Sequence, residues 1–431
     1  MIGPGLTTSY APPFALVRNH FVVSAAAYFS LTIALVVVAP WMQGHYFQPH
    51  LLGLTHLAAL GWISMIIMGA LYQLVPVVLE TRLWSARLAQ ITFWIFLPGA
   101  LGLIMHLWAY QTGPGLWGSG SLTLLAFILF VANLLATLAH VEKWNITGVH
   151  ILAALAAIVL AATLGFALAY NLSKPYLPGD HLHYLRAHAH LAFLGWVLLV
   201  VMGVAYKLIP MFSLAHGYSM TAGMWAFGLV SFATIGLMTA WSFNLFAGHS
   251  NASNHLEVFY ALLLAAGIAA FLGQMWQVFR HRMRKQTDVS MHHTVLSFIF
   301  LAFATTLGVA QFFLPARWPQ ATQDGLVLLY GWLGFIGFAG FIIVGQTYKI
   351  LPFLVWFNKY SDRVGQTKVP MLKDMFDERL AKIELVLMST GFLLAAVALP
   401  SANTTLFRFG AVVLSVSAAI FVWNVITIFR R

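Results

Sequence analysis

The chain has 431 residues, of which 61% are hydrophobic and 8% are charged, and it contains no cysteine. This composition excludes an ordinary soluble domain, and the lack of cysteine excludes disulfides, thiolate metal sites and cysteine nucleophiles. The net charge of +11 does not indicate nucleic-acid binding, because the basic residues collect in alternate loops of an apolar chain. That distribution is typical of a membrane protein whose basic loops stay in the cytoplasm.

Apolar stretches of about 20 residues, each long enough to cross a bilayer, recur along the whole chain. The polar segment 357–379 is predicted as a cytoplasmic loop. Both termini are expected in the cytoplasm, with the protein in a bacterial or archaeal inner (plasma) membrane. In chain order the twelve predicted spans are 14–40, 50–79, 86–109, 119–140, 148–171, 185–212, 219–246, 256–280, 291–314, 325–356, 380–400 and 405–429.

The second, sixth and tenth spans are related in sequence. The second span holds HLAALGW, which starts at His56, and the sixth holds HLAFLGW, which starts at His190, 134 residues later (190 minus 56). The third copy has Trp332 in place of the histidine. It keeps other residues of the pattern at a further offset of 142 (345 minus 203), namely Gly337, Gly345, Tyr348, Lys349 and Pro352.

The repeated helix predicts the architecture. We expect an all-α integral membrane protein that forms one domain over residues 1–431. Its twelve transmembrane helices would form three pseudo-threefold-related four-helix repeats, closed into a ring with the second helix of each set lining the interior. His20, His150 and His293 lie near the starts of the first helices. The predicted repeats are 14–140, 148–280 and 291–429.

The two repeated histidines are the strongest candidates for a site. A neutral imidazole in an apolar helix suits a metal or heme iron, so His56 and His190 are predicted as ligands near the outer leaflet. The alternative is a buried histidine bonded to a neighbouring hydroxyl or carbonyl group, but Trp332 indicates that the scaffold does not need the histidine. His188 lies about 200° around the helix from His190, so it is predicted to face a different pocket, water or a heme propionate.

Other residues have weaker interpretations. Arg186 and Arg317, with Lys174, are the few basic residues on the outer side and are candidates to neutralise propionates. The glycines of the repeated helix, Gly61, Gly69, Gly195 and Gly203, favour close helix packing over heme accommodation. Tyr72, Tyr206 and Tyr348 are predicted in the interfacial aromatic belt, and Lys207 and Lys349 are predicted to extend to that surface.

Most of the remaining histidines and the acidic residues named below are predicted to lie at helix ends or in loops, whereas His106 is predicted inside the third span without an assigned role. His292 and His293 are interpreted as loop-edge residues. Glu80, Glu257 and Glu384 fall near span ends, and the scarcity of acidic residues in mid-span argues against proton pumping. The outer-loop histidines could admit a metal ion, although solvated loop residues are the commoner case, and they are His45, His50, His181, His183, His249 and His255.

One motif resembles a known family. The pair His188 and His190, followed by LGWV from Leu194 and then by Gly203, Tyr206, Leu208 and Pro210, resembles the tenth helix of cbb-type heme–copper oxidase catalytic subunits. The resemblance implies an oxidase-like fold with His56 and His190 on a low-spin heme and His188 at a high-spin heme. The motif lies on the sixth span here, and neither a three-histidine copper site nor a cross-linked His–Tyr pair is found. The chain also resembles NnrS-type membrane heme proteins, which are linked to nitric oxide stress.

The sequence thus favours a membrane protein with one b-type heme, or two, and without copper. It would act in respiratory electron transfer or in nitric oxide or oxygen handling. Its expected partners are the lipid bilayer, a cytochrome or quinol electron donor and a small gas ligand (NO or O2), and no nucleic acid. Two alternatives stay open. One is a divergent oxygen or nitric oxide reductase, an oxidoreductase that would need a second metal. The other is a heme- or metal-handling assembly protein or transporter.

Overall fold

The computed structural model describes residues 10–247, 251–315 and 317–431. Within these residues, twelve helices are long and apolar enough to cross a membrane, and their positions agree with the predicted spans to within a few residues for most of them. The described residues contain no strand beyond an isolated bridge between Ala215 and Arg282. The protein is therefore an all-helical, multi-pass membrane protein.

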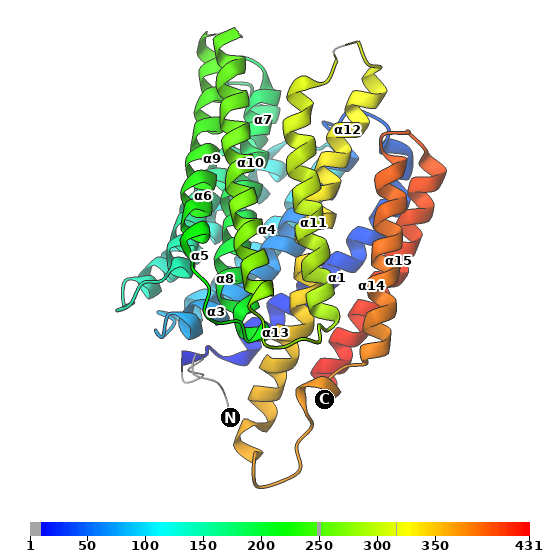
Figure 1. Ribbon diagram of the computed structural model, residues 1–431. Helices are drawn as coiled ribbons and strands as arrows, with labels where there is room; N and C mark the ends of the chain where they lie inside the picture. Colours follow the sequence, from blue (N-terminus) through cyan, green and yellow to red (C-terminus); the bar gives the residue numbers. More distant parts are fainter. Residues whose placement is uncertain (1–9, 248–250, 316) are drawn as a thin grey trace. The chain divides into compact units, whose positions relative to one another are not determined.

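The helices follow one another with short connections (Figure 1). In chain order the α-helices are α1 (Phe14–Val38), α2 (Pro49–His56), α3 (Met65–Val78), α4 (Ala86–Trp108), α5 (Pro114–Leu138), α6 (Ile146–Ser173), α7 (His181–His190), α8 (Leu199–Ser213), α9 (Thr221–Ala247), α10 (Asn251–Arg280), α11 (Val289–Ala310), α12 (Gln320–Trp332), α13 (Phe341–Tyr360), α14 (Glu378–Ala398) and α15 (Thr404–Arg430).

Three of the spans contain an eight-residue π-helical segment in the middle of the helix. The segments are η3 (Leu57–Ser64), η4 (Leu191–Leu198) and η6 (Leu333–Gly340). They begin directly after His56, His190 and Trp332, so their spacings equal the offsets of the sequence repeat. A π segment widens the helical turn and is frequent at functional sites.

The same three helices are the most buried of the candidate spans in the described part of the chain. In the most apolar 18-residue stretch of each of these helices, 78%, 72% and 67% of the residues are buried. In the other spans the buried share of the corresponding stretch is at most 50%. The other helices carry more exposed apolar side chains, as expected for surfaces that face lipid.

The chain divides into two compact units, each described here by itself. The first unit contains Ile67–Lys285, with the chain up to Val17 and the short segment Gly308–Phe313. The second unit contains Arg18–Ile66, Gln286–Leu307 and Leu314–Arg431. His190 therefore belongs to the first unit and His56 to the second.

The first unit is built on two helical hairpins and the helices packed against them. Helix α4 pairs with α5 and α9 pairs with α10, while α6 packs against α5, α7, η4 and α8 (Figure 1). Asn133 of α5 holds the loop before α4, since its side chain accepts from the Ser85 amide at 3.1 Å and donates to the Ser85 carbonyl at 2.8 Å. Ser85 in turn caps α4 by accepting from the Leu88 amide.

The second unit contains the hairpin of α14 and α15 (Figure 1). These helices approach closely where two glycines face each other, because an ideal Cβ on Gly391 would lie 2.7 Å from the Gly410 carbonyl oxygen. Elsewhere in this unit Tyr28 of α1 stacks on Trp62 of η3 with ring centroids 4.2 Å apart. Asp377 caps α14 by accepting from the amides of Arg379 and Leu380.

The structure corrects several sequence predictions. Tyr72, Tyr206 and Tyr348 are buried inside the protein and do not form an interfacial belt. Lys349 pairs with Asp288, which directly precedes α11, instead of extending alone to the surface. The segment predicted as a loop from residue 357 is partly helical, because α13 continues to Tyr360 and two short 3-10 turns follow.

Candidate functional site

His190 is the last residue of α7 and directly precedes the π segment η4. Its Nδ1 lies 2.9 Å from the carbonyl oxygen of Arg186, one turn earlier. A carbonyl oxygen can only accept a hydrogen bond, so Nδ1 carries the hydrogen and a neutral ring keeps its lone pair on Nε2. Histidines that ligate a metal through Nε2 commonly have this arrangement. The ring packs edge-on against Trp241 of α9, with centroids 4.9 Å apart.

His56 has the same local geometry within the second unit. It ends α2 before the π segment η3, and its Nδ1 lies 2.8 Å from the Leu52 carbonyl oxygen. This bond orients the ring and sets the tautomer, but it does not by itself identify a ligand. Several other histidines, within helices or just after their last turn, make the same bond to the residue four positions earlier, namely His106, His140, His150, His281 and His293.

The third copy fills the equivalent position with a packed indole. Trp332 is buried, and its Nε1 donates to the Phe392 carbonyl oxygen at 3.1 Å. Its ring stacks on Phe392 with centroids 5.9 Å apart and an angle of 13° between planes. His56 and His190 are only half-buried. The position before a π segment therefore takes a packed aromatic side chain in one copy and a less enclosed imidazole in the other two.

His188 faces a different neighbour from His190, as its spacing predicted. Its Nδ1 lies 2.9 Å from the Ala161 carbonyl oxygen on α6. The ring occupies the space over Gly165, where an ideal Cβ would come within 2.7 Å of the imidazole. His188 thus bridges α7 to α6, whereas His190 packs against α9.

The three basic residues that were predicted to lie near heme propionates have different local surroundings. The Arg186 guanidinium lies 3.8 Å from the Glu257 carboxylate and 5.8 Å from the centre of the Trp241 ring. It therefore shares Trp241 with His190, but its charge is partly compensated. Lys174 lies over the Tyr170 ring at 6.0 Å. Arg317 is exposed in a turn of the second unit.

Four of the histidines predicted in the outer loops lie instead in helices, because the helices begin earlier than predicted: His50 in α2, His181 and His183 in α7, and the exposed His255 in α10. Several of the predicted loop histidines have local contacts. His45 accepts from the Phe47 amide at 3.1 Å, and His50 stacks on Trp41 at 4.3 Å. His181 lies 3.2 Å from Asn171, and His183 lies 3.9 Å from Asp180. His249 lies outside the described residues. Within the described part of the chain, no group of three or more His, Asp or Glu side chains is arranged to share a metal ion.

Two glycines of the repeated helix serve close packing in the first unit. An ideal Cβ on Gly195 would lie 2.6 Å from the Ala157 Cβ, and one on Gly203 would lie 2.5 Å from the His150 Cβ. Both neighbours are on α6. The packing interpretation is confirmed for these two positions.

The sequence analysis missed one polar site. His293 was interpreted as a loop-edge residue, but it is fully buried, and its Nε2 lies 3.1 Å from Oε2 of the equally buried Glu384. The missed signal is the spacing of four polar residues on α11, Ser290, His293, Thr294 and Ser297, which follows the i, i+3, i+4, i+7 pattern of a single helix face.

Comparison with known proteins identifies a distant relative. No protein-family model matches the chain. The chain is 25% identical over 306 residues to a protein of Aquifex aeolicus (strain VF5) that is described as uncharacterized. The match covers 70% of this chain and 71% of the relative.

Proposed function

We propose that this membrane protein binds b-type heme through His56 and His190. One observation carries the proposal. Each histidine ends a helix directly before a π segment and bonds the carbonyl one turn earlier through Nδ1, so Nε2 is proposed as the ligating nitrogen. Trp332 fills the equivalent position of the third copy by packing alone, so the imidazoles are not a requirement of the helix.

The chemistry of the ligand suits respiratory electron transfer. Imidazole is a common axial ligand of heme iron, and two imidazoles give a six-coordinate iron that cycles between ferric and ferrous states without binding a gas. An iron with one imidazole keeps an open position, at which nitric oxide or oxygen binds. Arg186 and Arg317 are proposed to interact with propionates, and a cytochrome or a quinol is the proposed electron donor.

We further propose that the twelve helices are three four-helix repeats with an oxidase-like fold. The three π segments are separated by the same numbers of residues as the copies of the sequence repeat, which supports this arrangement. A recurring aromatic contact supports it as well, since the buried tyrosine of each repeated helix meets a phenylalanine of the last helix in its set. The pairs are Tyr72 with Phe130 at 5.1 Å, Tyr206 with Phe271 at 5.7 Å and Tyr348 with Phe421 at 5.7 Å.

Optical spectra of the detergent-purified protein test the heme proposal. The oxidised and dithionite-reduced wild type should show heme b bands. A reduced band that carbon monoxide does not shift identifies a closed bis-imidazole iron, whereas a shift identifies an open position for a gas. His56→Ala and His190→Ala should each lose or alter the heme spectrum, while the exposed-histidine control His281→Ala should not. Wild-type protein without a Soret band, prepared from cells supplied with heme, would overturn the proposal.

A further inference from the structure

His293 and Glu384 form a buried pair in the second unit, on α11 and α14. Both side chains are fully buried, and Nε2 of the imidazole lies 3.1 Å from Oε2 of the carboxyl group. The two atoms are at ion-pair distance, but their orientation does not meet hydrogen-bond geometry. Ser417 of α15 donates to the other carboxyl oxygen at 3.0 Å. Ionisable groups inside a membrane are costly and commonly mark a function.

The geometry indicates that this pair holds a proton. Nδ1 of His293 lies 2.8 Å from the Val289 carbonyl oxygen, so Nδ1 already carries a hydrogen. Without a further proton, the Nε2 lone pair would face a carboxylate oxygen in surroundings of low dielectric, which is unfavourable. One additional proton removes this repulsion, either as imidazolium beside carboxylate or as neutral imidazole beside carboxylic acid.

Among the described residues that interact with the pair, none carries a fixed positive charge that would replace the proton. Tyr28 of α1 and Tyr348 of α13 interact electrostatically with Glu384, and the Tyr348 ring lies 6.2 Å from the His293 ring between centroids. From α15 Ser417 donates to Glu384, and Asn424 donates to the Tyr348 hydroxyl at 3.4 Å. The nearby lysine of α13, Lys349, is paired with Asp288. The pair therefore changes charge only by gaining or losing a proton.

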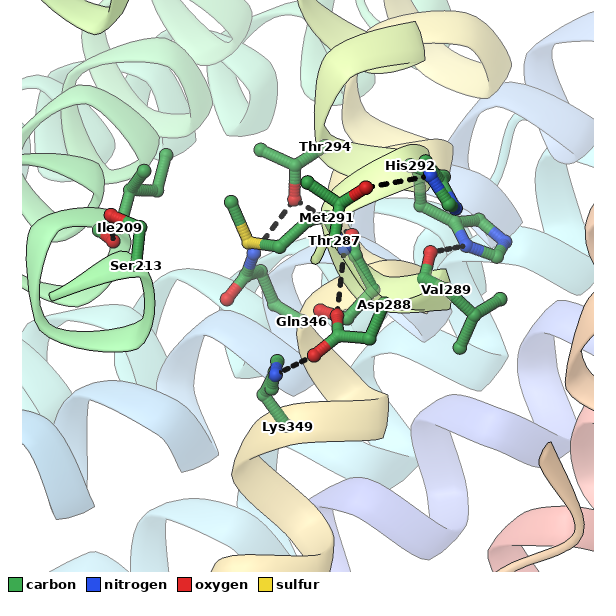
Figure 2. A network of polar contacts seen from close by, with 12 residues as sticks. Ile209, Ser213, Thr287, Asp288, Val289, Met291, His292, Thr294, Gln346 and Lys349 are labelled. Atoms are coloured by element: carbon green, nitrogen blue, oxygen red, sulfur yellow. Dashed lines mark hydrogen bonds and ion pairs between the residues drawn. The ribbon is translucent and has the colours of Figure 1, made fainter. Parts of the chain in front are cut away.

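Polar side chains of α11 and α13 lie between the pair and the start of α11, and Thr294 is next to His293 in the chain. Figure 2 shows Lys349 of α13 facing Asp288, which directly precedes α11, and Gln346 of α13 facing Thr294 of α11. Asp288 and Lys349 are partly exposed, and Gln346 donates to the Thr294 hydroxyl at 2.8 Å, next to His293 in the chain. The Ser290 hydroxyl and Oε1 of Gln346 are buried without a protein partner in the described structure. Such atoms are sites where ordered water can bind.

The first unit contains a similar buried histidine, His150, and among its described residues no acidic side chain pairs with that histidine. There His150 lies against Gly203, as His293 lies against Gly345, and each histidine has the tyrosine of the repeated helix beside it. A phenyl ring, Phe227, closes the His150 site with centroids 4.6 Å apart. Packing of a buried histidine in this fold therefore does not need a carboxylate, and Glu384 adds chemistry that the scaffold does not require.

We infer that His293 and Glu384 form a proton-binding site within the membrane, which exchanges its proton with the membrane face at which α11 begins, through Gln346, Thr294 and the Asp288–Lys349 pair. This inference does not depend on heme. The site takes up one proton from water, and either the imidazole or the carboxyl group carries that proton. The scarcity of acidic residues in mid-span argued against proton pumping. The inferred site needs only one buried glutamate, Glu384, together with His293 to bind a proton.

Infrared spectroscopy of the full-length protein in lipid nanodiscs tests the site. Wild-type minus Glu384→Gln difference spectra, recorded over the pH range in which the fold is retained, should show a Glu384 carboxyl or carboxylate band, or a coupled His293 ring band, that changes with pH. The Gln variant preserves shape and the bond to Ser417. If it does not fold, uniform 13C labelling of glutamate in the wild type identifies the band by its shift. A Glu384 and His293 signal that is the same at every pH would reduce the pair to a structural contact and overturn the inference.

Deuterium exchange of the same band tests the route. After transfer to D2O, Asp288→Asn and Gln346→Leu should slow exchange at Glu384 by at least tenfold relative to the wild type. Thr306→Val, on an exposed position of α11 away from the polar face, is the matched control and should exchange like the wild type. Unchanged exchange in both route variants would overturn the proposed connection to this membrane face.

Discussion

Gly203 of α8 lies against His150 of α6 so closely that an ideal Cβ on the glycine would stand 2.5 Å from the histidine Cβ, and Gly345 of α13 has the same relationship with His293 of α11. A real Cβ contact is never this short, so any side chain at these positions must push the helices apart. In each unit, therefore, a histidine on the first helix of a four-helix set packs directly against a glycine on the second helix, and this contact sets how closely the two helices approach.

Alanine at these glycines should destabilise the protein. We expect Gly203→Ala and Gly345→Ala to lower the free energy of unfolding by about 1–3 kcal/mol each, as overpacking does in well-packed interiors. Gly228→Ala in the first unit and Gly331→Ala in the second are matched controls, because their Cβ positions meet nothing within 4 Å. The controls should be neutral or gain up to about 1 kcal/mol from helix propensity. Equal thermal stability of all four variants in detergent would contradict the packing argument.

Trp332 should be a structural anchor of the second unit. We expect Trp332→Ala to cost about 3–5 kcal/mol, because it removes a buried indole and leaves a cavity beside Phe392. Trp332→Phe keeps most of the volume and loses the bond from Nε1, so its cost should be smaller, at about 1 kcal/mol. Trp94→Ala on an exposed face of α4 is the control. Denaturation in mixed detergent micelles measures the series, and a cost for Trp332→Ala no greater than that of Trp94→Ala would refute this role.

His188 should contribute to stability more than to heme binding. Its Nδ1 bonds to the Ala161 carbonyl oxygen and its ring covers Gly165, so His188→Ala should lower the free energy of unfolding by about 1–3 kcal/mol. The heme-to-protein ratio, measured by the pyridine hemochrome assay, should stay at the wild-type value, in contrast to His190→Ala. A loss of half or more of the heme in His188→Ala would instead assign His188 to a second heme.

Much of the fold was predictable from the sequence because crossing a bilayer imposes a simple length requirement. Within lipid every backbone amide must bond internally, so a long apolar stretch becomes a helix whatever its neighbours are. The offsets between His56, His190 and Trp332 also predicted which three helices share a local geometry. The π segments themselves were not predictable, because apolar periodicity does not distinguish a wider turn from a regular one.

The chain by itself determined the twelve spans, the absence of thiol chemistry and the candidate ligands His56 and His190, because these depend on composition and on repetition along the chain. The tertiary structure decided which polar groups meet. Glu384 and His293 are 91 residues apart (384 minus 293), and each alone is typical of a residue near a helix end. Only the packing of α11 against α13 and α14 places both in one buried site. Burial and distance between side chains arise from helix contacts that no local pattern encodes.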